Sequence, residues 1–236
     1  MGLDIYVGSL TRYYAGDWQT VVQQAGQEMG MAVEIIRPHQ TEGAIKDQNE
    51  IGQIVVAWRD QLSQALGANL AAPLTWNESH EVPYFTDKPA WDCYTSLLLW
   101  AAYDEHREMN RPAEYVEDLA TDPAFLASTE DGFRSRYGQL LHDVEIWFPC
   151  DFEFTFRSPD PSGNQLTMGS SVTLAKQLKD LNDRTWRADG ETLKAWRTEG
   201  AESQCPLEIG ARFAFAIVVE LAEQSVTHKL PMRLDY

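Results

Sequence analysis

The chain has few cysteines and no long hydrophobic run. Cys93, Cys150 and Cys205 lie far apart and form no Cys-x-x-Cys motif, so the sequence predicts neither a disulfide framework nor a thiolate zinc site. The longest apolar stretches, 97–102 and 213–219, are far shorter than the roughly 20 residues that a membrane-spanning helix needs. The first residues lack the basic and apolar regions of a signal peptide. We therefore expect a cytoplasmic chain that has no membrane partner.

Basic residues are scarce. Lys and Arg number 19 against 36 Asp and Glu, which gives a formal net charge of −17. The acids are spread along the chain, so the charge belongs to the folded surface. Because nucleic acids and anionic membranes are bound through clustered Lys and Arg, neither is an expected partner. Long-range attraction instead favours a basic partner, although acidity also serves solubility alone.

Sequence motifs for metal, nucleotide or nucleophilic chemistry are missing. The chain has no His-Glu-x-x-His, no glycine-rich phosphate loop and no Gly-x-Ser-x-Gly, so it predicts no metal site and no cofactor. The segment from His142 to Glu145 has the spacing His-x-x-Glu, but it lies where a helix gives way to a strand, and we interpret it as chance. The five histidines are widely separated: His39, His80, His106, His142 and His228.

The hydrophobic pattern predicts a helix-rich α+β fold. Alternation or short apolar runs indicate strands over 3–7, 31–37 and 144–157, the last divided by a bend or hairpin at Pro149 and Cys150, with a loop over 8–16. The segment 207–225 alternates like a strand, but its length without a turn signal favours a helix. We expect a single domain over 1–236, with a small sheet of about four strands packed by amphipathic helices and a candidate lobe junction near 158–165. The other helices are expected over 18–29, 51–66, 89–109, 170–186 and 190–198, with shorter helical pieces over 112–142.

Two loops carry large aromatic side chains among acids. Tyr and Trp beside acids are typical of surfaces that bind cationic partners, and also of sugar or amine pockets. Packing of the same aromatics onto the body of the protein is the simpler interpretation. The candidate binding residues are Tyr13, Tyr14, Trp76, Glu78, Glu81, Tyr84, Asp87, Trp91 and Asp92.

Three functions are compatible with these features. The leading hypothesis is a non-catalytic, bacterial-type cytoplasmic protein that binds a basic protein through its acidic, aromatic-rich loops, as an immunity protein binds a toxin. The alternative is a hydrolase-type small-molecule enzyme that uses a carboxylate, Glu105 or Asp92, in an aromatic-lined pocket. Glu105 falls on an apolar helix stripe, where desolvation raises the pKa of a carboxyl group. A structural subunit of a homo-oligomer is the third hypothesis, and the sequence leaves the oligomeric state open.

Overall fold

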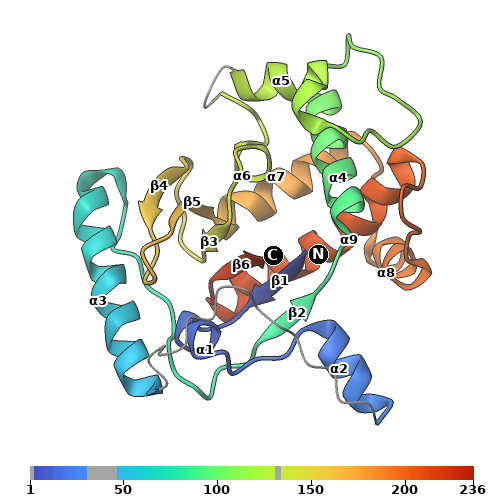
Figure 1. Ribbon diagram of the computed structural model, residues 1–236. Helices are drawn as coiled ribbons and strands as arrows, with labels where there is room; N and C mark the ends of the chain where they lie inside the picture. The colour runs from blue at the N-terminus through green and yellow to red at the C-terminus, as the bar shows by residue number, and fades with distance from the viewer. Residues whose placement is uncertain (1–2, 31–46, 131–133) are drawn as a thin grey trace.

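The computed structural model describes residues 3–30, 47–130 and 134–236 (Figure 1). Within these ranges six strands form a mixed sheet in the order β2-β1-β6-β3-β5-β4. Neighbouring strands are antiparallel except β3 and β5, which run parallel. The strands are β1 (Asp4–Val7), β2 (Phe85–Asp87), β3 (Ile146–Phe148), β4 (Phe156–Pro159), β5 (Gln165–Ser170) and β6 (Met232–Asp235).

Helices of very different length surround the sheet. None within the described ranges combines the length and the apolar character needed to span a bilayer. The helices are α1 (Leu10–Ala15), α2 (Val21–Glu28), α3 (Gln48–Leu66), α4 (Trp91–Glu105), α5 (Pro123–Glu130), α6 (Gly138–Leu141), α7 (Ser171–Arg184), α8 (Gly190–Glu199) and α9 (Leu207–His228), with 3-10 turns η1 (Gly67–Asn69) and η2 (Leu119–Thr121).

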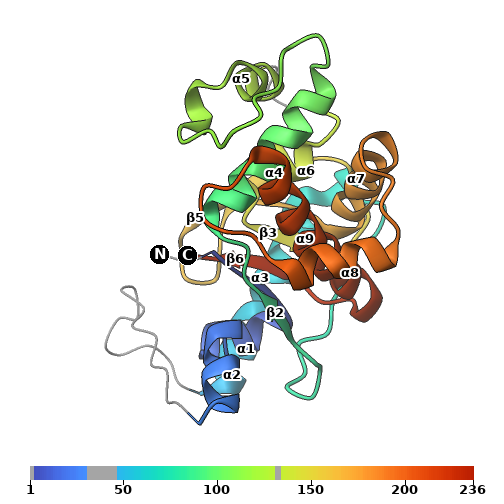
Figure 2. The same cartoon turned by 90° about the vertical axis from the view of Figure 1, so that its right-hand side faces the viewer.

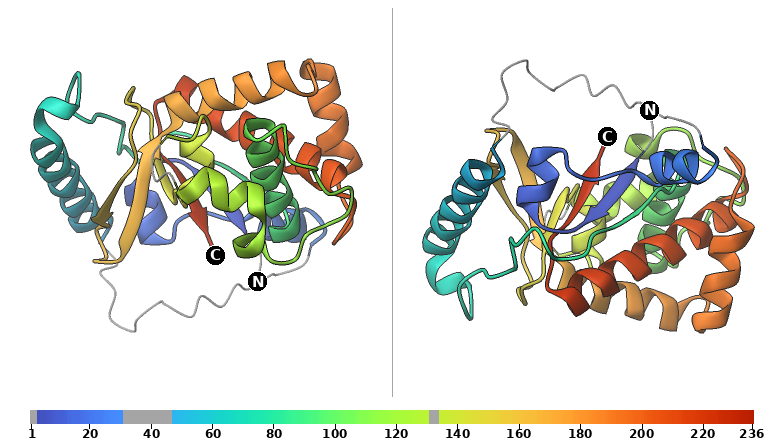
Figure 3. Two further views of the ribbon diagram at one scale, coloured as in Figure 1. Left: turned by 90° about the horizontal axis from the view of Figure 1, so that it is seen from above. Right: turned by 90° about the horizontal axis from the view of Figure 1, so that it is seen from below.

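The two faces of the sheet are covered by different helices. Strand β3 shows this directly, because Trp147 packs into one hydrophobic cluster while Ile146 and Phe148 pack into another. The Trp147 side belongs to the cluster built from α4, α7 and α9, with α4 lying along α9. The opposite side belongs to α3, which Figures 1 and 3 show on the far side of the sheet from α4 and α9. Successive strand residues point to opposite faces, so one short strand serves both cores.

Local signals explain where several helices begin and end. Thr20 and Gln23 form a reciprocal capping box at the start of α2, so this helix begins three residues later than the expected start at residue 18. Ser170 caps α7 through its hydroxyl, which accepts a hydrogen bond from the N–H of Thr173. Helix α3 ends at Gly67, as its position in the sequence predicts.

The α+β class and the long helices agree with the sequence-based expectation, but the sheet is larger than the four strands expected. Strands β2 and β6 are only three and four residues long, too short for alternation to be recognised. The segment 8–16, expected to be a loop, contains α1. The expected strand 144–157 is interrupted, since β3 ends at Phe148 and β4 begins at Phe156. Segment 207–225 is helical, and the expected strand 31–37 lies outside the described residues.

The segment 158–165, considered above as a lobe junction, lies within the sheet. It contains the end of β4 and the beginning of β5, which pair in register from Phe156 with Met168 to Pro159 with Gln165. Gly163 adopts a positive φ of 86° in the connecting turn, a conformation that glycine reaches without strain. At the other end of the molecule, Figure 2 shows α1 and α2 projecting away from α5.

Candidate ligand-binding site

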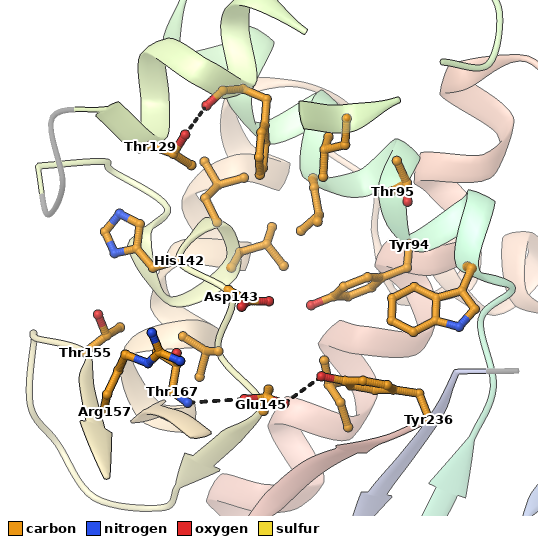
Figure 4. Close-up of a pocket in the computed structure, with 18 of the residues that line it drawn as sticks. Tyr94, Thr95, Thr129, His142, Asp143, Glu145, Thr155, Arg157, Thr167 and Tyr236 are labelled. Atoms are coloured by element: carbon orange, nitrogen blue, oxygen red, sulfur yellow. Dashed lines mark hydrogen bonds between the residues drawn. The ribbon is translucent and has the colours of Figure 1, made fainter. Parts of the chain in front are cut away.

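A cavity of about 690 Å³ lies between the first turns of α4, the α5–α6 region and the edge of the sheet formed by β4, β5 and β6. This volume is in the range of small-molecule sites. One part of the wall is apolar and includes Leu98, Phe125, Leu140 and Leu141. Polar side chains gather on the other part, around the chain that connects α6 to β3 (Figure 4). The cavity therefore offers a ligand an apolar half and a polar half.

Three aromatic rings form one side of the cavity. Trp91 meets Tyr94 edge to face with ring centroids 6.4 Å apart, and meets Tyr236 edge to face at 5.3 Å. Trp91 is 39% exposed and Tyr236 60% exposed, while Tyr94 is buried. The exposed rings therefore stand at the entrance, and the buried one lies deeper.

Asp143 occupies the centre of the polar half. It follows α6 directly and has a φ of 53°, in the left-handed region that Asp and Asn tolerate better than most residues. This turn aims the carboxyl group into the cavity, where it faces the hydroxyl group of Tyr94 (Figure 4). Among the described residues, no side chain or backbone N–H donates a hydrogen bond to the Asp143 carboxyl, and none forms an ion pair with it. An unpaired carboxyl group thus faces an aromatic-lined space.

Glu145 adds a second carboxyl group to the same wall. Val144, between the two acids, is buried in the core, so Asp143 and Glu145 both line the cavity. The hydroxyl group of Tyr236 donates to Glu145 Oε1 at 2.6 Å, and the N–H of Thr167 donates to Oε2 at 3.3 Å. Glu145 is therefore held in place, in contrast to the carboxyl group of Asp143.

The pKa shifts in the cavity follow from this arrangement. Burial of the carboxyl group raises the pKa of Asp143, nearby Glu145 raises it further, and Arg157 partly offsets both. Burial, followed by the charge of Asp143, raises the pKa of the Tyr94 hydroxyl. Burial also lowers the pKa of His142, against the attraction of Glu105. By residue type, the cavity holds two acidic side chains, Asp143 and Glu145, and one arginine, Arg157.

The candidate residues on and near α1 contact their own chain. The hydroxyl group of Tyr13 donates to Asp235, and that of Tyr14 donates to Asp160 Oδ2 at 2.9 Å. Arg233 lies over both rings, 4.4 and 5.3 Å from their centroids. These two tyrosines therefore attach α1 to the C-terminal strand of the sheet.

The candidates between Trp76 and Asp87 are also scattered. Trp76 is buried and stacks on Phe148 at 4.9 Å. The carboxylate of Glu78 accepts the backbone N–H groups of Leu10 and Thr11, which stabilises the start of α1. The remaining three lie elsewhere: Tyr84 under the guanidinium of Arg12, Asp87 in an ion pair with Arg197 at 2.7 Å, and Glu81 exposed to solvent.

The two carboxylates considered for catalysis do not line the cavity. Asp92, at the start of α4, accepts the N–H of Gln204 at 2.5 Å and the hydroxyl group of Ser203 at 2.9 Å. Burial opposes ionisation of Asp92, but these hydrogen bonds outweigh it and lower the pKa of the carboxyl group. Glu105 accepts hydrogen bonds from Ser128 and Ser135 at the other end of α4. Asp92 thus connects α4 to the segment before α9, and Glu105 connects α4 to α5 and to the segment before α6.

The structure thus brings one predicted binding residue, Trp91, to the cavity, and joins it to residues that the sequence had not singled out. Asp143 and Glu145 belong to the His-x-x-Glu segment that we had interpreted as chance. Their placement on both sides of an apolar Val144 was the available signal. Tyr94 and Tyr236 gave no signal of their own, because a buried tyrosine in a helix and one at the end of a chain are both common.

Comparisons of the chain with protein-family models, with curated proteins and with solved structures found no match. Within the described ranges, no three His, Cys, Asp or Glu side chains are grouped so that they could hold a metal ion. A function is therefore inferred from the chemistry of the cavity itself.

Proposed function

We propose that this protein binds a small organic cation, an ammonium or guanidinium group on an apolar body, in the cavity beside α4. The observation that carries the proposal is the Asp143 carboxyl group, which has no partner among the described residues and faces an aromatic-lined space. Asp143 is exposed to solvent, but the cavity wall desolvates its carboxyl group enough to raise the pKa, and carboxyl groups with a perturbed pKa are frequent in binding sites.

The charges in the cavity favour a positively charged ligand. Asp143 and Glu145 place two carboxylates on one wall, and the charge of Glu145 disfavours ionisation of Asp143. Arg157 supplies one guanidinium, so the ionised side chains sum to a net negative charge. A ligand cation between the carboxylates would offset their repulsion and would give the Asp143 carboxyl group an ionic partner.

The remaining walls suit the rest of such a ligand. Trp91, Tyr94 and Tyr236 present rings that attract a cation through their quadrupoles, worth about 0.5–2 kcal/mol per contact. The wall that contains Leu98 and Phe125 would bury the apolar body. A volume near 690 Å³ leaves room for a ligand larger than a simple amine.

Isothermal titration calorimetry with two probes of nearly equal shape tests the proposal. Benzylammonium carries the charge, and benzyl alcohol replaces the ammonium by a neutral hydroxyl group. Because a hydrogen bond to a charged group contributes about 1.5–3 kcal/mol, we expect benzylammonium to bind at least about tenfold more tightly. Equal affinities for the two probes, or no saturable binding of benzylammonium, would refute the proposal.

Three variants assign the effect to the cavity. Asp143→Asn keeps the shape and tolerates the left-handed backbone, so we expect it to lose the preference for the ammonium probe. Arg157→Gln removes the opposing charge and should strengthen binding of that probe. Asp60→Asn makes the same charge change on α3, across the sheet, where Asp60 is exposed, and it should leave both affinities unchanged. A loss of preference in Asp60→Asn equal to that in Asp143→Asn would show bulk electrostatics instead of a site.

A basic protein partner is the second candidate. The exposed rings of Trp91 and Tyr236 at the entrance, together with the net charge of −17, favour insertion of a Lys or Arg side chain of such a partner. A pull-down from a lysate at low and at high salt, with the wild type and Asp143→Asn compared, separates the candidates. A basic protein captured by the wild type and lost with Asp143→Asn supports this second function. Capture that does not depend on Asp143 contradicts it.

A further inference from the structure

A second hollow, of about 330 Å³, lies at the other end of α4, against the end of α7 and the beginning of α9. Three arginines reach it, Arg107, Arg111 and Arg184, although the chain as a whole is strongly acidic. Grouped guanidinium groups are the usual protein donors to carboxylate and phosphate oxygens. Three arginines around one hollow are unexpected on a chain with a net charge of −17.

Arg111 has no ionic partner among the described residues. Its guanidinium carbon lies over the indole ring of Trp100, 3.4 Å from the ring centroid, and no hydrogen bond or ion pair within the described ranges satisfies its N–H groups. Burial lowers the pKa of Arg111, against the attraction of Glu208 and Asp104. The guanidinium therefore lies against Trp100 at the wall of the hollow, and its N–H donors are left for a ligand.

The other two arginines are paired but not saturated. Arg184 Nε donates to Asp104 Oδ2 at 2.6 Å, and Arg107 Nε donates to Oδ1 at 3.0 Å. Each guanidinium has five N–H donors, so donors remain for a further acceptor. The other acid of the hollow, Glu208, forms an ion pair with Arg212. The hollow therefore holds three guanidinium groups and two carboxylates, and one of these carboxylates, that of Glu208, also pairs with Arg212, which does not line the hollow.

The two tryptophans of the hollow carry unsatisfied donors. The indole Nε1 atoms of Trp100 and Trp186 are buried and have no hydrogen-bond partner among the described residues. Leaving a buried N–H unpaired costs about 1–3 kcal/mol, so such groups often mark a missing ligand or water. The two rings stack on each other with centroids 5.0 Å apart, and the Arg111 guanidinium also lies against Trp100.

We propose that this hollow binds a small oxyanion, a phosphate or carboxylate group, held by Arg111 together with Arg107 and Arg184. The inference is independent of the cation-binding function proposed for the larger cavity, because the two sites share no lining residue. The anion would supply acceptors to Arg111 and offset the excess positive charge of the hollow.

Nuclear magnetic resonance of the indole N–H groups tests this proposal on the full chain. Trp100 and Trp186 line the hollow, so we expect their indole signals to shift saturably with inorganic phosphate or with acetate at constant ionic strength, set with sodium chloride. Trp100→Phe and Trp186→Phe identify the two signals by removing them. A larger response to phosphate indicates a phosphorylated ligand, and a larger response to acetate indicates a carboxylate ligand. No saturable shift with either anion would overturn the proposal.

Two arginine variants complete the test. Arg111→Met keeps an apolar side chain over Trp100 and removes the donors, and we expect the anion to bind at least about tenfold more weakly. Arg59→Met is the matched control, because Arg59 also lies over a tryptophan, Trp76, at 5.5 Å, but on α3 across the sheet. Circular dichroism confirms that each variant is folded. Equal binding by the wild type and Arg111→Met, or an equal loss in Arg59→Met, would contradict the assigned site.

Discussion

Replacement of Asp104 by asparagine is expected to destabilise the protein through a single buried carboxylate. The Asp104 side chain is only 2% exposed and accepts hydrogen bonds from Arg184 Nε at 2.6 Å, from the hydroxyl group of Tyr137 at 2.5 Å and from Arg107 Nε at 3.0 Å. The amide group introduced by Asp104→Asn keeps one acceptor oxygen and turns an NH₂ group toward donors. The change therefore breaks a hydrogen-bonded network that joins α4 to α7 and to the start of α6.

The size of the expected loss in unfolding free energy follows from the burial of the Asp104 carboxylate. Removing one partner of a fully buried ion pair costs about 3–5 kcal/mol. The side chains of Arg107 and Arg184 are 56% and 30% exposed, so water recovers part of the loss. We expect the free energy of unfolding at pH 7 to fall by about 2–3 kcal/mol, and the melting temperature to fall by roughly 5–10 °C for a chain of this size.

The pH dependence gives a second, independent expectation. Burial opposes the charge of Asp104, but the hydrogen bonds to its three donors outweigh burial and lower its pKa. A lowered folded-state pKa contributes stability that is present above the unfolded value of about 3.9 and is lost as the pH falls through the folded value. The difference between wild type and Asp104→Asn should therefore shrink below about pH 4.

Urea titration followed by circular dichroism between pH 3 and pH 7 measures both effects. Asp180→Asn is the control, because Asp180 pairs with Arg136 at the surface, where both side chains are more than 40% exposed, and such a pair contributes about 0.2–1 kcal/mol. A loss in Asp104→Asn no larger than that in Asp180→Asn, or one that stays constant to pH 3, would refute this reasoning.

Two further substitutions test the packing of β5 against Gln139 and the charge of the cavity wall. A Cβ atom at Gly169 would lie 2.0 Å from Gln139 Oε1, an atom that already accepts a hydrogen bond from Ser170 N. Gly169→Ala should therefore lower the free energy of unfolding by about 1–3 kcal/mol, and an unchanged urea midpoint would contradict the close approach. Asp143 has a raised folded-state pKa, so its ionisation destabilises the fold as the pH rises through that pKa. Asp143→Asn should therefore be slightly more stable than the wild type at pH 7 and equally stable below about pH 3, whereas a loss of stability at pH 7 would contradict the charge argument.

The sequence predicts those parts of the fold whose pattern repeats over several turns. Helix α3 has apolar residues at helical spacing from Ile51 to Leu62 and ends at Gly67, and α9 could be assigned by its length alone. Strands β2 and β6 contain only three and four residues. The alternation of a strand repeats every two residues, so these segments are too short for the pattern to identify them. Pairing with neighbouring strands, β2 with β1 and β6 with both β1 and β3, makes them strands.

The candidate site was less predictable, because its residues come from segments far apart in the chain. Trp91, Asp143 and Tyr236 meet only after α4, the α6–β3 connection and β6 have packed together. The large aromatics of the loops were visible, yet most of them, such as Trp76, are used for packing. The left-handed backbone that aims Asp143 into the cavity depends on its neighbours in space and leaves no mark in the sequence.

The most direct test of the proposed cation site is the pKa of the Asp143 carboxyl group, measured by carbon-detected nuclear magnetic resonance with and without saturating benzylammonium. A cation bound beside Asp143 stabilises its ionised form, so the pKa should fall by at least about one unit, equivalent to tenfold tighter binding to the ionised carboxylate. A pKa that is unchanged on saturation would contradict the account, because the ligand charge would then lie away from Asp143.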